Sequence, residues 1–473
     1  MSFCLNSPIL ARTVYAAQER LVGRPTFDYA RRIEESQWLS REGVEALQMS
    51  KLGALLKIAV DHCPWHAARI RAASIDPNVP LTMDDLRKIS PMTKADARNH
   101  IEGLCWKGVP GGAFSYNTGG SSGQPLVFCF GRWRQASDAA GRMRARRWWG
   151  VEVGEPEVYL WGAPVELNKT DHIKRFRDRL LNQLVLNAFA MSPENMDRFV
   201  EHIRAFKPKC IYGYATSIAL LAAHASDRGM DLGIPGLRVV CTTGEPLYPH
   251  QRKLIEEVYG VPAANEFGSR DIGFTAHESP EGQMLLMSES IVLEVLNEDG
   301  EPVADGELGE AVMTGLCSDA QPFIRYRTGD IVKLSKERCK AGRGLHVIEE
   351  VTGRSTDFVT RSDGTIMHAL AVIYAIRPVT GVGEFKFVQN SLKDFDVWVV
   401  PTNGWGLESM GAIRGGLEAR LGPDARIVIK AVDEIKPEAS GKHRYVVSRV
   451  PVRTGLAGAM GLETANEINV NRP

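Results

Sequence analysis

The sequence of 473 residues has no excess of either charge and lacks several features that mark particular protein classes. Its 57 basic and 57 acidic residues cancel, so no overall field attracts nucleic acid or an anionic membrane surface. No apolar run approaches the roughly 20 residues of a membrane span, and no basic start precedes a secretory-type apolar run. Its eight cysteines include no CxxC pair, which is typical of reduced thiols. We therefore expect a cytoplasmic protein that acts on small molecules or specific protein surfaces.

A glycine-rich segment, YNTGGSSGQPL at 116–126, stands between two stretches whose patterns predict packed structure. Its glycines let backbone N–H groups turn inward, and its serine and threonine hydroxyls add donors, so the segment is able to wrap a phosphate. It lacks the Gly-Lys-Ser/Thr ending of a Walker loop, which argues against an ordinary P-loop NTPase. On these residues alone, a flexible turn and a phosphate-binding loop both remain open.

The order of predicted elements indicates an α/β protein. Strands alternate with helices from residue 157 to 267, which predicts a mainly parallel sheet with helices on both faces. After Gly282, two strand-like runs separated by the turn signals NEDG and ADGE predict an antiparallel β-subdomain. The last region mixes strands at 396–400 and 426–432 with a helix at 407–421, which predicts a small α+β unit.

The chain is too long for a single hydrophobic core, so we expect more than one domain. We predict a large N-terminal domain at 1–352, a small mobile C-terminal domain at 353–453 and a poorly ordered tail at 454–473. A helix is expected from Trp38, with Ser40 available as a cap, and Pro64 is expected to end it. Residues 1–35 show little periodicity, and their pattern fits a mobile arm and a packed extension equally well.

Further motifs follow the glycine-rich segment at wide intervals. They are TTGEPL at 242–247, NEFGSRDIG at 265–273, RYRTGD at 325–330, TGRSTDFV at 352–359 and SGKHR at 440–444. The first two fall at the carboxyl ends of predicted parallel strands, where such sheets bind ligands. In this order and spacing, and together with TGGSSGQP, the motifs resemble those of the adenylate-forming (ANL) ligases. Within these, the resemblance is to the phenylacetate-CoA ligases and their relatives in capsular polysaccharide synthesis, and it covers roughly residues 35 to 450.

The resemblance implies a two-step reaction with ATP, Mg²⁺ and coenzyme A. A carboxylate attacks the α-phosphorus of ATP and expels pyrophosphate, and a thiol then captures the acyl adenylate. The expected catalytic residues are Lys442, Asp271 and Arg354, with Asp271 as the metal ligand, although the family usually has Glu there. The ATP- and AMP-binding residues would be Thr118, Gly119, Gly120, Ser121, Ser122, Gly123, Gly244, Glu245, Pro246, Asn265, Glu266, Phe267, Gly268, Ser269 and Asp330. A hinge is expected at 353–357, because one small domain must serve both steps.

The acid-binding pocket is expected beside the TTGEP segment. Its residues would be Trp161, Gly162, Tyr212, Gly213 and Tyr214, whose rings favour an aryl or arylacetic acid, with acyl and amino acids as alternatives. Several relatives have a Cys/His zinc cluster after the FGSRD-like motif, but this chain offers only His277 there, so we predict no structural zinc. A basic stretch with Arg134, Arg142, Arg144, Arg146 and Arg147 is either a solvated helix face or a dock for phosphates.

Two other functions remain open at this point. The enzyme would pass its acyl group to an amine, a sugar or a carrier protein in place of coenzyme A, or the chain would be a nucleotide-binding relative without turnover. Retention of Lys442, Asp330 and the glycine-rich segment argues against the second alternative. Whether the protein forms a homodimer is also left open.

Overall fold

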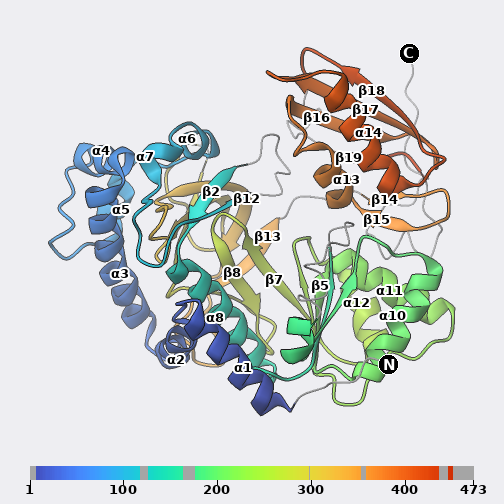
Figure 1. Ribbon diagram of the computed structural model, residues 1–473. Coiled ribbons are helices and arrows are strands. Elements are labelled where there is room, and N and C mark those ends of the chain that lie inside the picture. The colour runs from blue at the N-terminus through green and yellow to red at the C-terminus, as the bar shows by residue number, and fades with distance from the viewer. Residues whose placement is uncertain are drawn as a thin grey trace.

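The computed structural model describes residues 7–117, 126–162, 176–297, 299–352, 358–435 and 446–450. An eleven-stranded sheet runs through most of this part of the chain, in the order β10-β11-β12-β13-β9-β8-β7-β6-β5-β3-β4 (Figure 1). Its parallel strands are β3 (Glu157–Trp161), β4 (Gln183–Asn187), β5 (Cys210–Tyr214), β6 (Val239–Thr243) and β7 (Ala263–Ser269). The predicted α/β fold with parallel strands is therefore confirmed.

Helices cover both faces of the parallel strands. On one face lie α10 (Pro193–Phe206), α11 (Ala215–Asp227) and α12 (Pro249–Tyr259), which share a hydrophobic core with Ile211 and Val240 of the sheet. Ser192 caps α10 by accepting a hydrogen bond from the Asn195 N–H at 3.2 Å, as its sequence predicts. On the other face lies α8 (Arg132–Trp148), whose Arg146 guanidinium sits over the Tyr212 ring.

The antiparallel strands expected after Gly282 continue the same sheet. They are β9 (Met284–Leu286), β10 (Ile291–Leu296), β11 (Leu308–Gly315), β12 (Tyr326–Leu334) and β13 (Val347–Thr352). The antiparallel part of the sheet already begins before Gly282, because β8 (Gly273–Glu278) pairs antiparallel with β7. Next to the antiparallel strands pack α3 (Arg41–His62), α4 (Pro64–Ala72), α5 (Met83–Lys88), α6 (Lys94–Asn99) and α7 (Ile101–Leu104). The Ser40 side chain caps α3, which ends at His62 just before Pro64, as predicted, and Pro64 begins α4. A hairpin of β1 (Phe114–Asn117) and β2 (Val127–Phe130) pairs Asn117 with Val127, on either side of residues 118–125.

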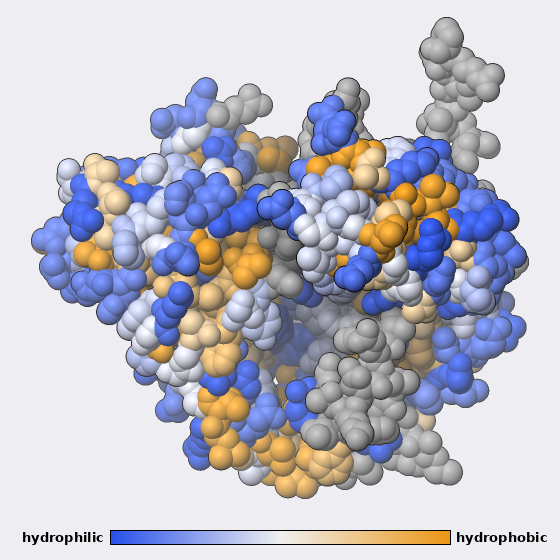
Figure 2. All heavy atoms as spheres, turned by 45° about the horizontal axis from the view of Figure 1, so that its top comes forward, coloured by the Kyte–Doolittle hydropathy of each residue, from blue (hydrophilic) through white to orange (hydrophobic). Residues whose placement is uncertain are grey.

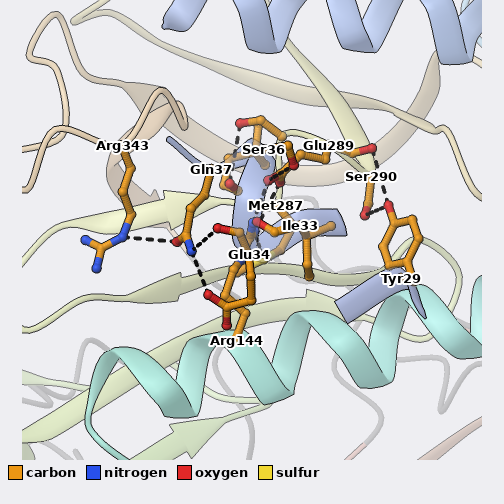
Figure 3. A network of polar contacts seen from close by, with 12 residues as sticks. Tyr29, Ile33, Glu34, Ser36, Gln37, Arg144, Met287, Glu289, Ser290 and Arg343 are labelled. Atoms are coloured by element: carbon orange, nitrogen blue, oxygen red, sulfur yellow. Dashed lines mark hydrogen bonds and ion pairs between the residues drawn. The ribbon is translucent and has the colours of Figure 1, made fainter. Parts of the chain in front are cut away.

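The N-terminal residues 8–36 form a packed extension, which settles the question left open by their sequence. They fold into α1 (Pro8–Leu21) and α2 (Thr26–Ser36). A buried ion pair fixes α2 to α8 and to the turn after β9 (Figure 3). Arg144 Nη1 donates to Glu289 Oε1 at 2.5 Å and to the Ile33 carbonyl at 2.9 Å, and Ser36 Oγ donates to the same Glu289 oxygen.

A C-terminal unit lies above the parallel strands in the view of Figure 1. It contains a hairpin of β14 (Phe358–Thr360) and β15 (Ile366–His368), followed by α13 (Ala369–Ile376). A four-stranded sheet, in the order β18-β17-β16-β19, completes it with β16 (Val382–Gln389), β17 (Asp394–Pro401), α14 (Leu407–Leu421), β18 (Arg426–Ala431) and β19 (Val446–Ser448). The expected mixture of strands and one helix is confirmed here. The domain boundaries stay predictions, because 353–357 and 451–473 lie outside the described residues.

The surface is mixed in polarity. Seen with the top of Figure 1 turned forward, the molecule shows two lobes that are largely hydrophilic, with apolar patches and a hollow between them (Figure 2). Within the described ranges, none of the helices has both the length and the apolar composition needed to cross a membrane.

The Arg144–Glu289 pair should be a main stabilising contact of the N-terminal extension. Both side chains are 1% exposed, so Glu289→Gln would leave a buried guanidinium without its counterion. We expect the free energy of unfolding to fall by about 3–5 kcal/mol in urea titrations. Glu42→Gln is the matched control, because its pair with Arg338 is exposed to solvent and such pairs contribute little to stability. Equal effects of the two substitutions would contradict the assignment.

Candidate functional site

The carboxyl ends of β5, β6 and β7 bring two of the predicted motifs together. In the sheet register Tyr214 lies opposite Thr243, Thr243 opposite Glu266, and Thr242 opposite Asn265. The TTGEPL and NEFGSRD segments are therefore neighbours at one edge of the sheet, which we call the strand-end rim. Ligands of parallel sheets bind at such an edge.

The Glu266 carboxylate joins the three strands at this rim. Its Oε1 accepts hydrogen bonds from the Tyr212 hydroxyl at 2.9 Å and from Thr243 Oγ1 at 3.0 Å. Its Oε2 is buried and has no hydrogen-bond partner in the described part of the chain. A buried carboxylate oxygen without a donor is costly, so this atom is available to a ligand donor.

The TTGEP turn is shaped by its glycine and anchored by its glutamate. Gly244 has a φ of +76°, and a Cβ there would lie 3.3 Å from the Tyr214 ring, so a side chain would strain the turn. Glu245 Oε2 accepts a hydrogen bond from the Thr216 N–H at 2.9 Å, which ties the turn to the start of α11. Gly244 is exposed and Pro246 half-buried, so these two residues present the turn to the rim.

The NEFGSRD segment is held mainly by its own backbone and by α8. Gly268 lies so close to the Gly273 carbonyl oxygen that a Cβ would meet it at 2.7 Å, and Ser269 Oγ accepts from the Ile272 N–H at 3.1 Å. Asn265 receives a hydrogen bond from Thr242 Oγ1 at 3.4 Å, whereas Phe267 is half-buried against the core near the β1–β2 hairpin. The segment thus forms a rigid edge beside the TTGEP turn.

Asp271 lies at the end of this segment and contacts a second motif. Its carboxylate is 5% exposed, and its Oδ2 accepts a hydrogen bond from the Tyr326 hydroxyl of RYRTGD at 2.7 Å. Arg134 of α8 donates to the Asp271 carbonyl at 2.9 Å, which fixes the turn. Asp330 of RYRTGD is half-buried on β12, close in sequence to that contact. The hydrogen bond therefore places the RYRTGD strand against the rim.

Asp271 fits a magnesium ion as one protein ligand. Among the described residues, its Oδ1 accepts from the Ile272 N–H at 3.3 Å and keeps a further lone pair for a metal ion. Mg²⁺ is often held by one or two carboxylates, with phosphates and water as its other ligands. Elsewhere in the described residues, no three His, Cys, Asp or Glu side chains gather as a metal-binding group. The prediction of no structural zinc stays a prediction.

The expected pocket residues divide into cavity walls and packing positions. A cavity of about 340 Å³ is lined by both Trp161 and Tyr212, whose rings stack with centroids 5.7 Å apart. Tyr214 stacks on Trp161 at 4.4 Å and is itself buried. Gly162 and Gly213 have a different role, because a Cβ would meet the Phe189 ring at 2.1 Å and the Leu160 carbonyl oxygen at 2.3 Å. They allow close packing behind the pocket.

The basic stretch on α8 is not a solvated face, and that interpretation is wrong for three of its arginines. Arg134, Arg144 and Arg146 are buried, and each forms an ion pair within the protein. The helical pattern alone did not separate them from the exposed Arg142 and Arg147.

The cavity lined by Trp161 and Tyr212 also uses residues that the sequence did not single out, namely Tyr15 of α1 and Glu157 and Tyr159 of β3. Burial raises the pKa of Tyr15 to about 12, so this phenol stays protonated.

The C-terminal unit contacts the rim through Arg270. Arg270, between Ser269 and Asp271, donates from Nη2 to the Tyr374 hydroxyl of α13 at 2.9 Å. The remaining predicted site residues lie outside the described residues. They are Thr118, Gly119, Gly120, Ser121, Ser122, Gly123, Arg354 and Lys442.

Comparisons with known proteins agree with the motifs. The family model described as the CapK C-terminal domain matches residues 359–449. Protein CapK of Staphylococcus aureus is 24% identical over 374 residues, 78% of this chain and 82% of that protein. Phenylacetate-coenzyme A ligases of Thermus thermophilus and Escherichia coli are each 25% identical and match 69% of this chain, over 73% and 75% of their own lengths.

Solved structures support the fold. A 2-hydroxyisobutyryl-CoA ligase in complex with 2-HIB-AMP and CoA has a TM-score of 0.58 at 20% identity, over 88% of this chain and 91% of that chain. An open conformation of that ligase gives 0.55, also at 20% identity, over 86% and 92%. The fold expected from the resemblance is thus confirmed.

The hydrogen bond between Tyr326 and Asp271 should stabilise the rim. Tyr326→Phe would remove the donor to a buried carboxylate oxygen, and we expect a loss of about 1–3 kcal/mol in the free energy of unfolding. Tyr259→Phe is the control, because the buried Tyr259 hydroxyl has no hydrogen-bond partner among the described residues. Urea titrations measure both variants. A loss at Tyr259 as large as that at Tyr326 would show that the contact contributes nothing specific.

Proposed function

We propose that the chain is an acid-CoA ligase of the adenylate-forming type, because it resembles CapK and the phenylacetate-CoA ligases in sequence and carries their motifs. It activates a carboxylic acid with ATP and transfers the acyl group to coenzyme A. The observation that carries this proposal is the meeting of three motifs at the strand-end rim. TTGEPL and NEFGSRD are neighbours in the sheet register, and the Tyr326–Asp271 hydrogen bond adds RYRTGD.

The rim supplies what adenylation requires from a protein, which is positioning and charge neutralisation. The acid oxygen forms a bond to the α-phosphorus as the bond to the β-phosphate breaks and pyrophosphate leaves. In this proposal Asp330 accepts the ribose hydroxyls, and Gly244 and Pro246 flank the adenine. Asp271 would hold Mg²⁺, whose charge would neutralise phosphate oxygens. In the second step the thiol of coenzyme A loses its proton and attacks the acyl carbonyl, and AMP leaves.

The cavity beside the rim is the proposed acid site. The Tyr212 hydroxyl links it to Glu266, so a ligand on Tyr212 lies next to the rim. The stacked rings of Trp161 and Tyr212 favour an aryl or arylacetic acid, since aromatic rings stack well on such walls. An amine, a sugar or a carrier protein as acceptor is the second candidate, and the likeness to CapK favours keeping it.

The test is pyrophosphate release from ATP with a panel of acids, with and without coenzyme A. Acid-dependent release that yields an acyl-CoA supports the proposal. Acid-dependent release without acyl-CoA formation would move the acceptor to the second candidate. No release with any acid would leave a nucleotide-binding protein without turnover and would overturn the proposal.

Lys442 is proposed to bridge the acid carboxylate and the α-phosphate. Lys442→Ala should therefore slow pyrophosphate release by about 100- to 1000-fold while ATP binding stays close to that of the wild type. Lys430→Ala is the control, because Lys430 is an exposed lysine of the C-terminal unit whose Nζ lies 3.6 Å from Asp396. A Lys442→Ala protein that keeps more than about half of the wild-type rate would remove this role.

Asp271 is proposed as the protein ligand of Mg²⁺. Asp271→Ala should raise the Mg²⁺ concentration needed for half-maximal pyrophosphate release and lower the maximal rate. Asp271→Glu should be tolerated, because it keeps a carboxylate and restores the residue usual in the family. Magnesium titrations of the three proteins provide the measurement. Identical titration curves would rule out the ligand role.

A further inference from the structure

The cavity beside the rim combines aromatic walls with charged groups. It is bounded by α1, by one face of α8 and by the strands β3 and β5. From α8, the residues at helical spacing 139, 142, 143 and 146 line it, so one stripe of the helix forms its wall. The other walls include the tyrosines Tyr15, Tyr159 and Tyr212 and the two glutamates Glu152 and Glu157. A purely hydrocarbon ligand would leave many of these groups without partners.

Arg142 is the charged residue of this cavity without an internal partner. Within the described ranges it forms no hydrogen bond or ion pair, and its guanidinium carbon lies 5.5 Å from the Phe274 ring centroid. Its side chain is exposed although protein groups surround it, which we explain by exposure toward the cavity that it lines. Burial and Arg146 oppose its charged form, but Tyr212, Glu266 and Asp138 together outweigh them, so the pKa of Arg142 is raised above its ordinary value.

Arg146, one turn further along α8, differs from Arg142 because it forms an ion pair within the protein. It is 5% exposed, its Nε donates to Glu157 Oε2 at 2.7 Å, and its guanidinium carbon lies 4.8 Å from the Tyr212 ring centroid. Its two Nη atoms are buried without hydrogen-bond partners in the described chain, so Glu157 satisfies only part of it. The floor of the cavity therefore offers N–H donors of Arg146 that Glu157 does not satisfy.

An arginine carries only donors, so a group that satisfies Arg142 must be an acceptor. A phenyl or alkyl end would displace water from the guanidinium and return no hydrogen bond, which is unfavourable. A carboxylate would form the short, often bidentate bonds that guanidinium groups prefer. Resting on the proposed acid-CoA ligase function, we propose that the cavity binds the far end of the acid, and that this end carries an oxygen acceptor, best a second carboxylate, which Arg142 binds.

The experiment compares acids that share the reacting group and differ at the far end. Phenylacetate, 4-hydroxyphenylacetate and 4-carboxyphenylacetate form one series, and hexanoate and adipate form an aliphatic pair. For the wild type we expect kcat/KM for pyrophosphate release to rise with the acceptor strength of the far end. Arg142→Gln should raise KM for the dicarboxylic acids about tenfold or more, with KM for phenylacetate and hexanoate nearly unchanged.

Two controls separate a binding role from a structural one. Arg142→Lys keeps the charge but loses the planar fork, so the KM for dicarboxylic acids should lie between those of the wild type and Arg142→Gln. Arg198→Gln removes an exposed arginine from α10, on the opposite face of the sheet, and should change neither acid series. If Arg142→Gln raises KM equally for all the acids, the proposal is overturned, because such a result would show a structural role for Arg142.

A binding measurement distinguishes failure of this inference from failure of the proposed function. Calorimetric titration of 4-carboxyphenylacetate into the wild type and Arg142→Gln needs no turnover. Tight binding that the substitution weakens supports the cavity assignment even if no acid releases pyrophosphate. Turnover of phenylacetate that equals or exceeds that of 4-carboxyphenylacetate would overturn the inference and leave the ligase proposal intact.

Discussion

Glu266 joins three parallel strands at the point where the candidate site begins. One of its oxygens accepts from Tyr212 of β5 and Thr243 of β6, while its backbone belongs to β7. Because the three side chains meet at one oxygen, the ends of the strands cannot shift independently. The turns that follow β6 and β7 are therefore held at a fixed distance from each other. Tyr212 also lines the proposed acid cavity.

A few specific contacts connect the rim to α8, to the RYRTGD strand and to the C-terminal unit. Arg134 of α8 holds the turn that carries Asp271, and Tyr326 brings the RYRTGD strand to the same carboxylate. Arg270 reaches the C-terminal unit through Tyr374. Residues from three distant parts of the sequence thus contact the turn that carries Arg270 and Asp271. Adenylation needs positioned groups, and this arrangement supplies fixed positions without a protein nucleophile.

Much of the fold was predictable because its signals are local. Ser40, Ser192 and Pro193 mark helix starts through capping and a fixed φ, and alternating elements imply a parallel sheet. The placement of two motifs at strand ends followed from the same pattern.

The details of the site depend on long-range packing, which the pattern does not encode. Arg142 and Arg146 stand one turn apart with the same chemistry, yet only Arg146 meets Glu157. Gly162 and Gly213 were predicted as pocket residues, whereas Phe189 and the Leu160 carbonyl explain why they are glycines. That α1 covers a cavity at β3 could not be predicted, because the contact joins parts of the chain more than a hundred residues apart.

The most direct test of the account is the identity of the product formed before any acceptor is added. The full-length protein is incubated with ATP, Mg²⁺ and the acid panel without coenzyme A, and the bound product is released and analysed by mass spectrometry. The account predicts a species with the mass of the acid plus AMP less one water, together with pyrophosphate. Formation of ADP and phosphate, or of an acyl phosphate, would contradict it.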